Sequence, residues 1–354
     1  LEAFDPLSLP VPVDLAATLI TLLDCPAIAT KAWVYRQYDQ QVGINSLVLP
    51  GSDAGVVRIR GTRKAVALTT DCNARFVYLN PRVGAAMAVA EAARNLAVTG
   101  ARPLGLTDCL NFGSPERPEI LWQFKEAVAG IAEACRALDI PVVGGNVSFY
   151  NETQGQAILP TPVIGMAGLI DEADTRRTQW FEAEGDRIAL LGPEAVSLGG
   201  SEFLWVIRGL MSGGLAPLDL DQERRVHEAC RAAIAAELVR GAHDCAEGGL
   251  AVTLAECCIS GPRPVGARVS LEDDGRRADL VLFGEGPSRV VVSVPPEGER
   301  HFERLMGEFA LPWRWIGRVG GEALVVSRGP VTEIAAPLDR MAHAWRAGFE
   351  RHVA

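Results

Sequence analysis

The sequence predicts an α/β protein with mixed sheets (an α+β arrangement), divided into two domains. Its 354 residues exceed what a single hydrophobic core usually holds. Short strand-like apolar runs alternate with longer helical patterns on both sides of residues 171–186. Those residues are polar and show little periodicity, so we place the boundary there. We expect a leading segment over 1–30, a first domain over 31–172, a linker over 173–186 and a second domain over 187–354.

The first domain is predicted to follow the order β-β-α-β-α-β-β. Asp14 is expected to cap a helix in the leading segment, before the domain begins. A helix over 84–98 should end before Gly100, and a second helix should open at Pro118. The expected strands cover residues 54–60, 64–70, 103–110, 140–143 and 161–170.

The second domain is predicted to start with a strand at Arg187. Helices are expected near 221–239 and 249–259, and the remaining expected strands are 288–294, 313–319 and 322–328.

Composition restricts the class of protein. Hydrophobic residues make up 48% and charged residues 22% of the chain, as in ordinary globular proteins. The eight cysteines form no CxxC pair and no zinc-spaced cluster, which favours a reducing cytoplasm. No apolar run reaches membrane-spanning length. The net charge of −10 argues against nucleic acid as a general partner, so phosphate ligands would depend on local dipoles and metal.

The chain begins with a proline-rich stretch, "LEAFDPLSLPVPVD", and has no initiator Met. We interpret it as part of a longer protein.

Two predicted strand ends in the first domain carry oxygen-bearing side chains. Asp108 ends one strand, and in "VVGGNVSFYNE" the strand over 140–143 leads into an expected loop, with Asn146 and Ser148 just after Gly144 and Gly145. Ligands of α/β sheets gather beyond the carboxyl ends of strands. Magnesium prefers oxygen ligands, so Asp108 and Asn146 would suffice beside a nucleotide's phosphates. Gly-Gly-Asn is equally good turn chemistry, and Asp108 could simply cap a loop.

Other motifs are less specific. Asp71 follows a strand but also fits an Asx turn. Gly248 and Gly249 precede a helix whose first N–H groups could hold a phosphate, although helix entry explains them as well. All five histidines lie in the second domain, so a general base in the first would be Asp or Glu, or come from elsewhere.

Six segments together resemble one family, the synthetase subunit of phosphoribosylformylglycinamidine synthase (PurL-type). The resemblance is to its C-terminal half and covers essentially the whole chain. It implies an N-type plus a C-type domain of the aminoimidazole-ribotide-synthetase-like kind. The segments are "WVYRQYD", "TTDCNARFVYLNP", "TGARPLGLTDCLNFGSPERPEI", "VVGGNVSFYNE", "HDCAEGGLAVTLAE" and "LFGEGPSRVVVSV".

The resemblance implies an ATP-dependent carbon–nitrogen ligase of purine biosynthesis. In that family, formylglycinamide ribonucleotide is converted to the amidine with ammonia from a glutaminase. Carried over by motif, Asp108 and Gly145 would bind ATP, Asn146 would ligate Mg²⁺ and Ser148 would contact the substrate. The implied partners are the N-terminal half of the same polypeptide, the glutaminase subunit and a small assembly subunit. The family packs its two halves sheet against sheet, so the isolated half is expected to form a homodimer.

Three positions depart from the family's first half, which reads "ESHNHPS" where this chain reads "DCNARFV". Asp71 stands in place of a metal-binding Glu, and Asn73 in place of the catalytic His. Asn95 replaces a metal-binding Asp. This half is therefore expected to contain no catalytic residue and to be inactive alone, and its own pocket could hold a structural nucleotide.

Two other functions stay open from the residues. One is a non-catalytic nucleotide-binding scaffold that supports assembly of the synthase. The other is a small-molecule kinase of the same superfamily, which the absence of histidine from the first domain disfavours.

Overall fold

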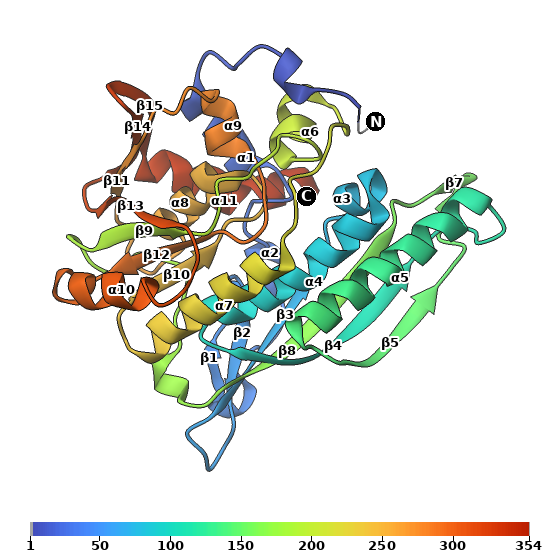
Figure 1. The fold of residues 1–354 in the computed structure, drawn as a ribbon, viewed down its shortest axis with the longest axis horizontal. Helices are drawn as coiled ribbons and strands as arrows, with labels where there is room; N and C mark the ends of the chain where they lie inside the picture. The colour runs from blue at the N-terminus through green and yellow to red at the C-terminus, as the bar shows by residue number, and fades with distance from the viewer. Residues whose placement is uncertain (1–2, 354) are drawn as a thin grey trace.

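The computed structural model describes residues 3–353, which form two large sheets with helices packed on them and one small two-stranded sheet (Figure 1). The first sheet has six strands in the order β1-β2-β3-β8-β4-β5. Only β4 and β5 pair in parallel; every other neighbouring pair is antiparallel. The strands are β1 (Ser46–Val48), β2 (Gly55–Arg58), β3 (Ala65–Asp71), β4 (Arg102–Asn111), β5 (Val142–Ser148) and β8 (Thr161–Ile170).

Helices cover one face of this sheet, as Figure 1 shows for α4 and α5. Alanines of α4 pack against the sheet through a face with almost no exposed surface, which allows close helix–sheet contact. Asn80 caps α4 by accepting a hydrogen bond from Val83 N (3.2 Å), so the helix starts earlier than the predicted residue 84. The helices of this layer are α3 (Ala74–Leu79), α4 (Pro81–Val98) and α5 (Pro118–Leu138). The short helix α2 (Ala32–Tyr35) lies against the C-terminal helix, and β6 (Glu152–Thr153) and β7 (Gln156–Ala157) form the small two-stranded sheet.

The opposite face of the first sheet carries partly exposed apolar side chains. Leu68 is 53% exposed and Val57 is 40% exposed. Val66, Val163 and Leu169 alternate with buried neighbours on β3 and β8, so they belong to the same face and are only half-buried. We call these five residues the open face.

The second sheet has seven strands in the order β10-β12-β9-β13-β11-β14-β15. Helices α7 and α10 pack on one face, and α1, α8, α9 and α11 pack on the other. The strands are β9 (Arg187–Leu191), β10 (Gly241–Asp244), β11 (Ala267–Leu271), β12 (Val290–Val294), β13 (Trp313–Val319), β14 (Ala323–Arg328) and β15 (Val331–Pro337). The helices are α6 (Glu202–Arg208), α7 (Leu220–Ala235), α8 (Gly249–Ile259), α9 (Ala278–Phe283), α10 (Glu299–Met306) and α11 (Leu338–Val353).

The leading helix α1 (Leu15–Asp24) packs in the second domain. Asp14 caps it as predicted, accepting a hydrogen bond from Ala17 N (2.8 Å). Leu19, Leu22 and Leu23 are fully buried in the core that contains α8 and α11. Four short 3₁₀ helices complete the described elements: Pro6–Ser8, Val42–Ile44, Ala173–Thr175 and Pro296–Gly298.

The mixed α/β architecture agrees with the sequence prediction. The loop expected from Gly144 to Ser148 is wrong. These residues belong to β5, because their backbone pairs with β4 as far as Asn111. Among the described residues, no helix is both long enough and apolar enough to cross a membrane.

Candidate nucleotide and metal site

The four site residues predicted from the sequence lie on the paired strands β4 and β5. Asp108 pairs with Gly145, and Asn146 and Ser148 follow along β5. A β-carbon at Gly145 would overlap the Asp108 carboxylate and lie 2.7 Å from the Asp108 carbonyl oxygen. Glycine is therefore required at this position by the close approach of Asp108.

Strand alternation separates these residues into two pairs. Asp108 and Gly145 lie on the helix-covered side, in the same alternation as the buried Leu106 and Leu110. Asn146 and Ser148 alternate to the open side of the sheet. The structure thus brings Asp108 next to Gly145 but does not place it on the face of Asn146. Asp108 and Asn146 do not form the single paired ligand set that the sequence suggested.

The edge position of β5 makes its backbone accessible. β5 is the last strand of the sheet, so its outer N–H and C=O groups have no neighbouring strand. Gly144, Gly145 and Asn146 are all exposed. Glycines without side chains allow a phosphate to approach such backbone groups. Partial burial raises the pKa of Asp108 above its ordinary value.

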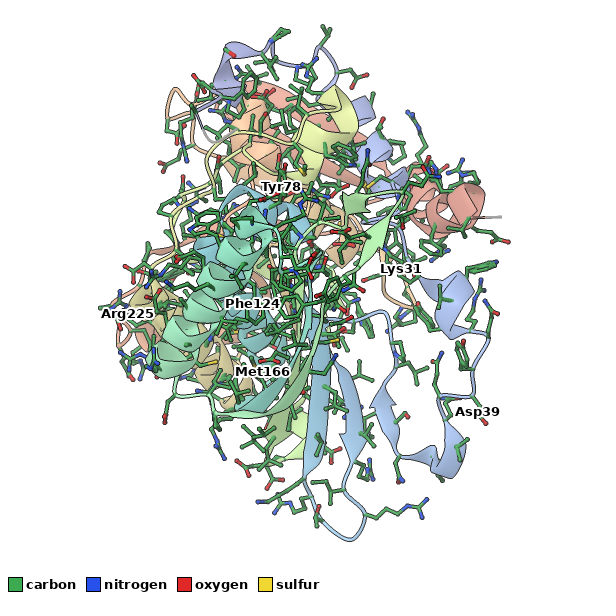
Figure 2. The ribbon with its side chains drawn as sticks, turned by 90° about the vertical axis from the view of Figure 1, so that its right-hand side faces the viewer. Lys31, Asp39, Tyr78, Phe124, Met166 and Arg225 are labelled. Carbon is green, nitrogen blue, oxygen red and sulfur yellow. The ribbon has the colours of Figure 1, made fainter. Side chains whose placement is uncertain are left out.

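A second group of polar residues surrounds a cavity of about 510 Å³ between the two domains. Asn95 Nδ2 on α4 donates a hydrogen bond to Asp71 Oδ2 at the end of β3 (3.2 Å). Glu91 lies one turn before Asn95 on α4, and Asp244 ends β10 in the second domain. All four residues line this cavity. In Figure 2, oxygen-bearing side chains crowd between the domains beside the labelled Lys31.

The carboxylates of this cavity are close enough to repel one another, and burial adds to the cost of their negative charges. Burial, together with the charges of Glu247 and Asp244, raises the pKa of Asp71 well above its ordinary value. Burial and the charge of Asp71 do the same for Glu91. Burial raises the pKa of Asp244 to about 7, although Arg94 opposes the shift. Several buried carboxylates with one amide oxygen are a donor set that suits a divalent cation, whose charge would relieve this repulsion.

Asn73 has a structural role. Its side chain caps α3 by accepting a hydrogen bond from Phe76 N (3.2 Å), and its Nδ2 donates to Glu247 Oε1 (3.4 Å). The position thus supplies neither a base nor an acid.

An imidazole does reach the cavity, from the second domain. His243 on β10 lies with Nδ1 2.7 Å from Asp53 Oδ1 and Nε2 3.3 Å from Glu256 Oε2. Burial lowers its pKa, but Asp53 and Glu256 outweigh burial and hold the pKa of His243 well above its ordinary value. A histidine that contacts two carboxylates stays protonated, so it is poorly suited to accept a further proton as a base. The sequence showed the residue but not its position.

Glu285 occupies the start of α8, where the sequence allows a phosphate site. Glu285 Oε1 accepts hydrogen bonds from Gly248 N and Glu202 N (both 2.7 Å). The helix-entry explanation of Gly248 and Gly249 is therefore the one supported, because a side chain already satisfies the helix start.

We expect Glu285→Gln to change the pH dependence of stability. Burial raises the pKa of Glu285 to about 8, so the folded protein keeps its proton through the range where the unfolded chain has lost it. The parent should therefore lose stability as pH rises from about 5 towards 8, whereas the glutamine variant keeps the acceptor oxygen without ionising. Urea unfolding at pH 5, 6.5 and 8 should show the free energy of unfolding of the variant rising relative to that of the parent as the pH increases. A constant difference would contradict the assignment.

Comparison with known proteins places the chain in a family. Residues 51–170 match the N-terminal domain, and residues 183–328 the C-terminal domain, of AIR synthase related proteins. The two matches follow one another along the chain and cover most of it, so the chain belongs to the AIR synthase related family. The fold class and the resemblance inferred from sequence are confirmed.

The relatives are more specific. The phosphoribosylformylglycinamidine synthase subunit PurL of Anaeromyxobacter dehalogenans is 47% identical over 99% of this chain, and that of Moorella thermoacetica 48% over 96%. The matches cover 47% and 46% of those proteins, so the chain spans about half the length of the curated relatives it matches.

Solved structures share the fold. "T. maritima PurL complexed with FGAR" superposes with a TM-score of 0.74 at 19% identity, covering 94% of this chain and 54% of that one. "T. maritima PurL complexed with ATP" superposes with a TM-score of 0.67 at 20% identity, covering 88% and 50%.

Proposed function

We propose that this chain is the C-terminal half of a PurL-type phosphoribosylformylglycinamidine synthase. The intact enzyme would use ATP to convert formylglycinamide ribonucleotide to its amidine in purine biosynthesis. The observation that carries the proposal is the 47% identity to PurL subunits over 99% of the chain. The adjacent Asp108 and Gly145, the latter on the exposed edge strand β5, support a ligand site in this half.

The four residues of β4 and β5 take the following roles in this proposal. Asp108 and Gly145 contact ATP, whose phosphates approach the glycine backbone at the edge of the sheet. Asn146 offers one neutral oxygen to Mg²⁺, and Ser148 contacts the substrate. When bound, the metal neutralises phosphate charge. This chain supplies binding and orientation, and the proton-transferring groups come from the N-terminal half.

The proposed partners follow from this division of work. They are the N-terminal half of the same polypeptide, a glutaminase subunit that supplies ammonia, and a small assembly subunit. The eight cysteines are all free in the structure, which suits the cytoplasmic location that we propose.

Reconstitution of the enzyme from its separate parts tests the proposal. The purified chain with ATP, Mg²⁺, ammonia and formylglycinamide ribonucleotide should form no amidine, because its first domain lacks a histidine base and Asn73 acts as a helix cap. General-base catalysis alone contributes about 10²–10⁴-fold. Adding the N-terminal half should restore turnover with ammonia, and adding the glutaminase should restore turnover with glutamine. Steady amidine formation by the chain alone would refute inactivity of the isolated half, and no activity in the full mixture would refute the proposed function.

A second candidate is a nucleotide-binding scaffold without a catalytic contribution. The cavity lined by Asp71, Glu91, Asn95 and Asp244 favours it, because this donor set suits a cation that accompanies a nucleotide. The synthase can be reconstituted with this chain carrying a substitution at Asn146 or Ser148. Amidine formation at the rate of the parent would then favour the scaffold role.

We expect the isolated chain to self-associate through the open face. Leu68 and Val57 are exposed in the middle of an apolar sheet surface, and such surfaces usually mark interfaces. Sedimentation at micromolar concentration should show a dimer, and Leu68→Lys should shift it to monomer. Val331→Lys is a matched control, since Val331 is 54% exposed on β15 of the other sheet. Only monomer in the parent protein would count against the interface.

A further inference from the structure

The neighbours of Thr107 in the first sheet are both glycines. Thr107 on β4 pairs with Gly144 on β5 and with Gly165 on β8. Paired residues point to the same side of a sheet, so Thr107 lies on the open side, together with Asn146 and Ser148. Thr107 is exposed, and its hydroxyl makes no hydrogen bond to any other residue that the structure describes. A polar side chain is thus free beside the proposed metal and substrate contacts.

Packing explains only one of these two glycines. A β-carbon at Gly165 would lie 3.1 Å from Thr107 Cγ2, which is tighter than most contacts of a real β-carbon. A β-carbon at Gly144 would lie 3.9 Å from Thr107 Oγ1, an ordinary van der Waals distance, and the φ of Gly144 is not positive either. Glycine inside a strand often marks the close approach of a ligand or of another backbone. Gly144 therefore leaves space for a group from outside this chain, and the Thr107 hydroxyl faces that space.

A β-bulge determines which residues face this space. Val143 is an extra residue in β5, inserted immediately before the pair of Thr107 with Gly144. Without it, Asn146 would turn to the helix-covered side, because a shift of one residue reverses every side chain that follows. Bulges are frequent next to active sites, where they change the direction of side chains. The bulge thus brings the glycine, the amide and the threonine hydroxyl to one side of the sheet.

We propose that the Thr107 hydroxyl donates a hydrogen bond to a phosphate of ATP that lies over Gly144. The inference rests on the proposed function, in which Asn146 holds Mg²⁺, Ser148 contacts the substrate and Gly145 contacts ATP. Positions 144, 146 and 148 follow one another along β5 at intervals of about 6.6 Å. A metal between ATP and the substrate has the substrate on its Ser148 side, so the Gly144 side is left for the phosphates.

The test is a pair of substitutions in the synthase reconstituted from both halves. Thr107→Val removes the hydroxyl but keeps the shape of the side chain, whereas Thr107→Ser keeps the hydroxyl. Calorimetry with Mg²⁺ and a non-hydrolysable ATP analogue should show a dissociation constant about tenfold higher for Thr107→Val, because a hydrogen bond to a charged group is lost, and within about twofold of the parent for Thr107→Ser. KM for ATP should follow the same order, while KM for formylglycinamide ribonucleotide stays within about twofold.

Gly144→Ala tests the space over the strand. The added methyl group meets Thr107 at an ordinary distance, so the melting temperature should not fall. It should nevertheless weaken binding of the analogue about tenfold, which is the order of cost when a methyl group enters an occupied space. Thr332→Val is the matched control, since Thr332 is also an exposed threonine on a strand, β15 of the other sheet. It should change neither quantity.

The outcomes separate the inference from the function on which it rests. If the parent forms amidine and Thr107→Val binds the analogue as the parent does, the Thr107 contact is wrong and the proposed function stands. Equal losses for Thr107→Ser and Thr107→Val, or a raised KM for formylglycinamide ribonucleotide alone, also overturn the contact with ATP. Unchanged binding with weaker association of the two halves in sedimentation would assign Thr107 and Gly144 to the interface instead. A reconstituted parent that forms no amidine overturns the proposed function together with the inference.

Discussion

Replacing Arg94 with methionine is expected to lower the free energy of unfolding by about 3–5 kcal/mol, the typical cost of removing one partner from a buried ion pair. Arg94 is 2% exposed on α4 of the first domain. Its guanidinium pairs with Glu223 on α7 (2.5 Å) and with Asp244 on β10 (3.3 Å), both in the second domain. The substitution would leave these two carboxylates buried without their shared cation.

The surrounding contacts make the loss hard to relieve. Glu223 is fully buried, and it also contacts His227 Nε2 (2.7 Å) and the Ser288 hydroxyl. Burial would raise the pKa of Glu223, but Arg94 and His227 outweigh burial and lower it to about 2. Without Arg94, this carboxylate must take up a proton or disorder the contact between α4 and α7.

Arg82→Met on the same helix is the control. Arg82 is 49% exposed and pairs with Glu126 and Glu133 at the surface, where a pair contributes about 0–1 kcal/mol. Urea unfolding followed by both fluorescence and circular dichroism should show a large shift for Arg94→Met and little for Arg82→Met. Similar shifts would mean that Arg94 is no more important than a surface charge. A separate early transition for Arg94→Met would show that the pair joins the domains.

Strongly periodic elements were predictable from the sequence. The strand over 161–170 and the helix over 249–259 were predicted with the bounds that the structure has, because each is mostly apolar along its length. The residues from Gly144 to Ser148 predict a loop, because glycine and asparagine favour turns. Pairing with β4, which is distant in sequence, makes them a strand instead.

The candidate site divides in the same way. Asp108, Gly145, Asn146 and Ser148 could be predicted as site residues because they lie in continuous motifs, and their roles stay predictions. His243 and Asp53 were missed as cavity residues, since a contact over 190 residues leaves no local signal. Glu91 could have been found, because it lies four residues before Asn95 and must share its helix face. The separation of Asp108 from Asn146 required the strand register.

Asn146→Leu in the reconstituted synthase is expected to lower kcat for ATP-dependent amidation by at least about a hundredfold, because residues that only support metal ligands already cost 10–100-fold. Leucine is close to asparagine in size but offers no oxygen to Mg²⁺. Asn146 is exposed on the edge strand β5, and its side chain makes no hydrogen bond to other described residues. Its replacement should therefore change the free energy of unfolding by less than about 0.5 kcal/mol.

Two further variants make the measurement decisive. Val143→Thr, on the same strand at a position 75% exposed, should leave both kcat and the melting temperature near those of the parent. Asp108→Asn should give a smaller loss of kcat in parallel, because Asp108 lies against Gly145 on the other side of the strand pair. In the proposed function it would contact the nucleotide and would not share the metal. Raising Mg²⁺ should partly restore the Asn146→Leu enzyme, since waters of the metal replace one lost ligand. It should not restore Asp108→Asn. An unchanged kcat with a lowered melting temperature for Asn146→Leu would instead make Asn146 a structural residue of the strand, and the metal would have to be held from the N-terminal half alone.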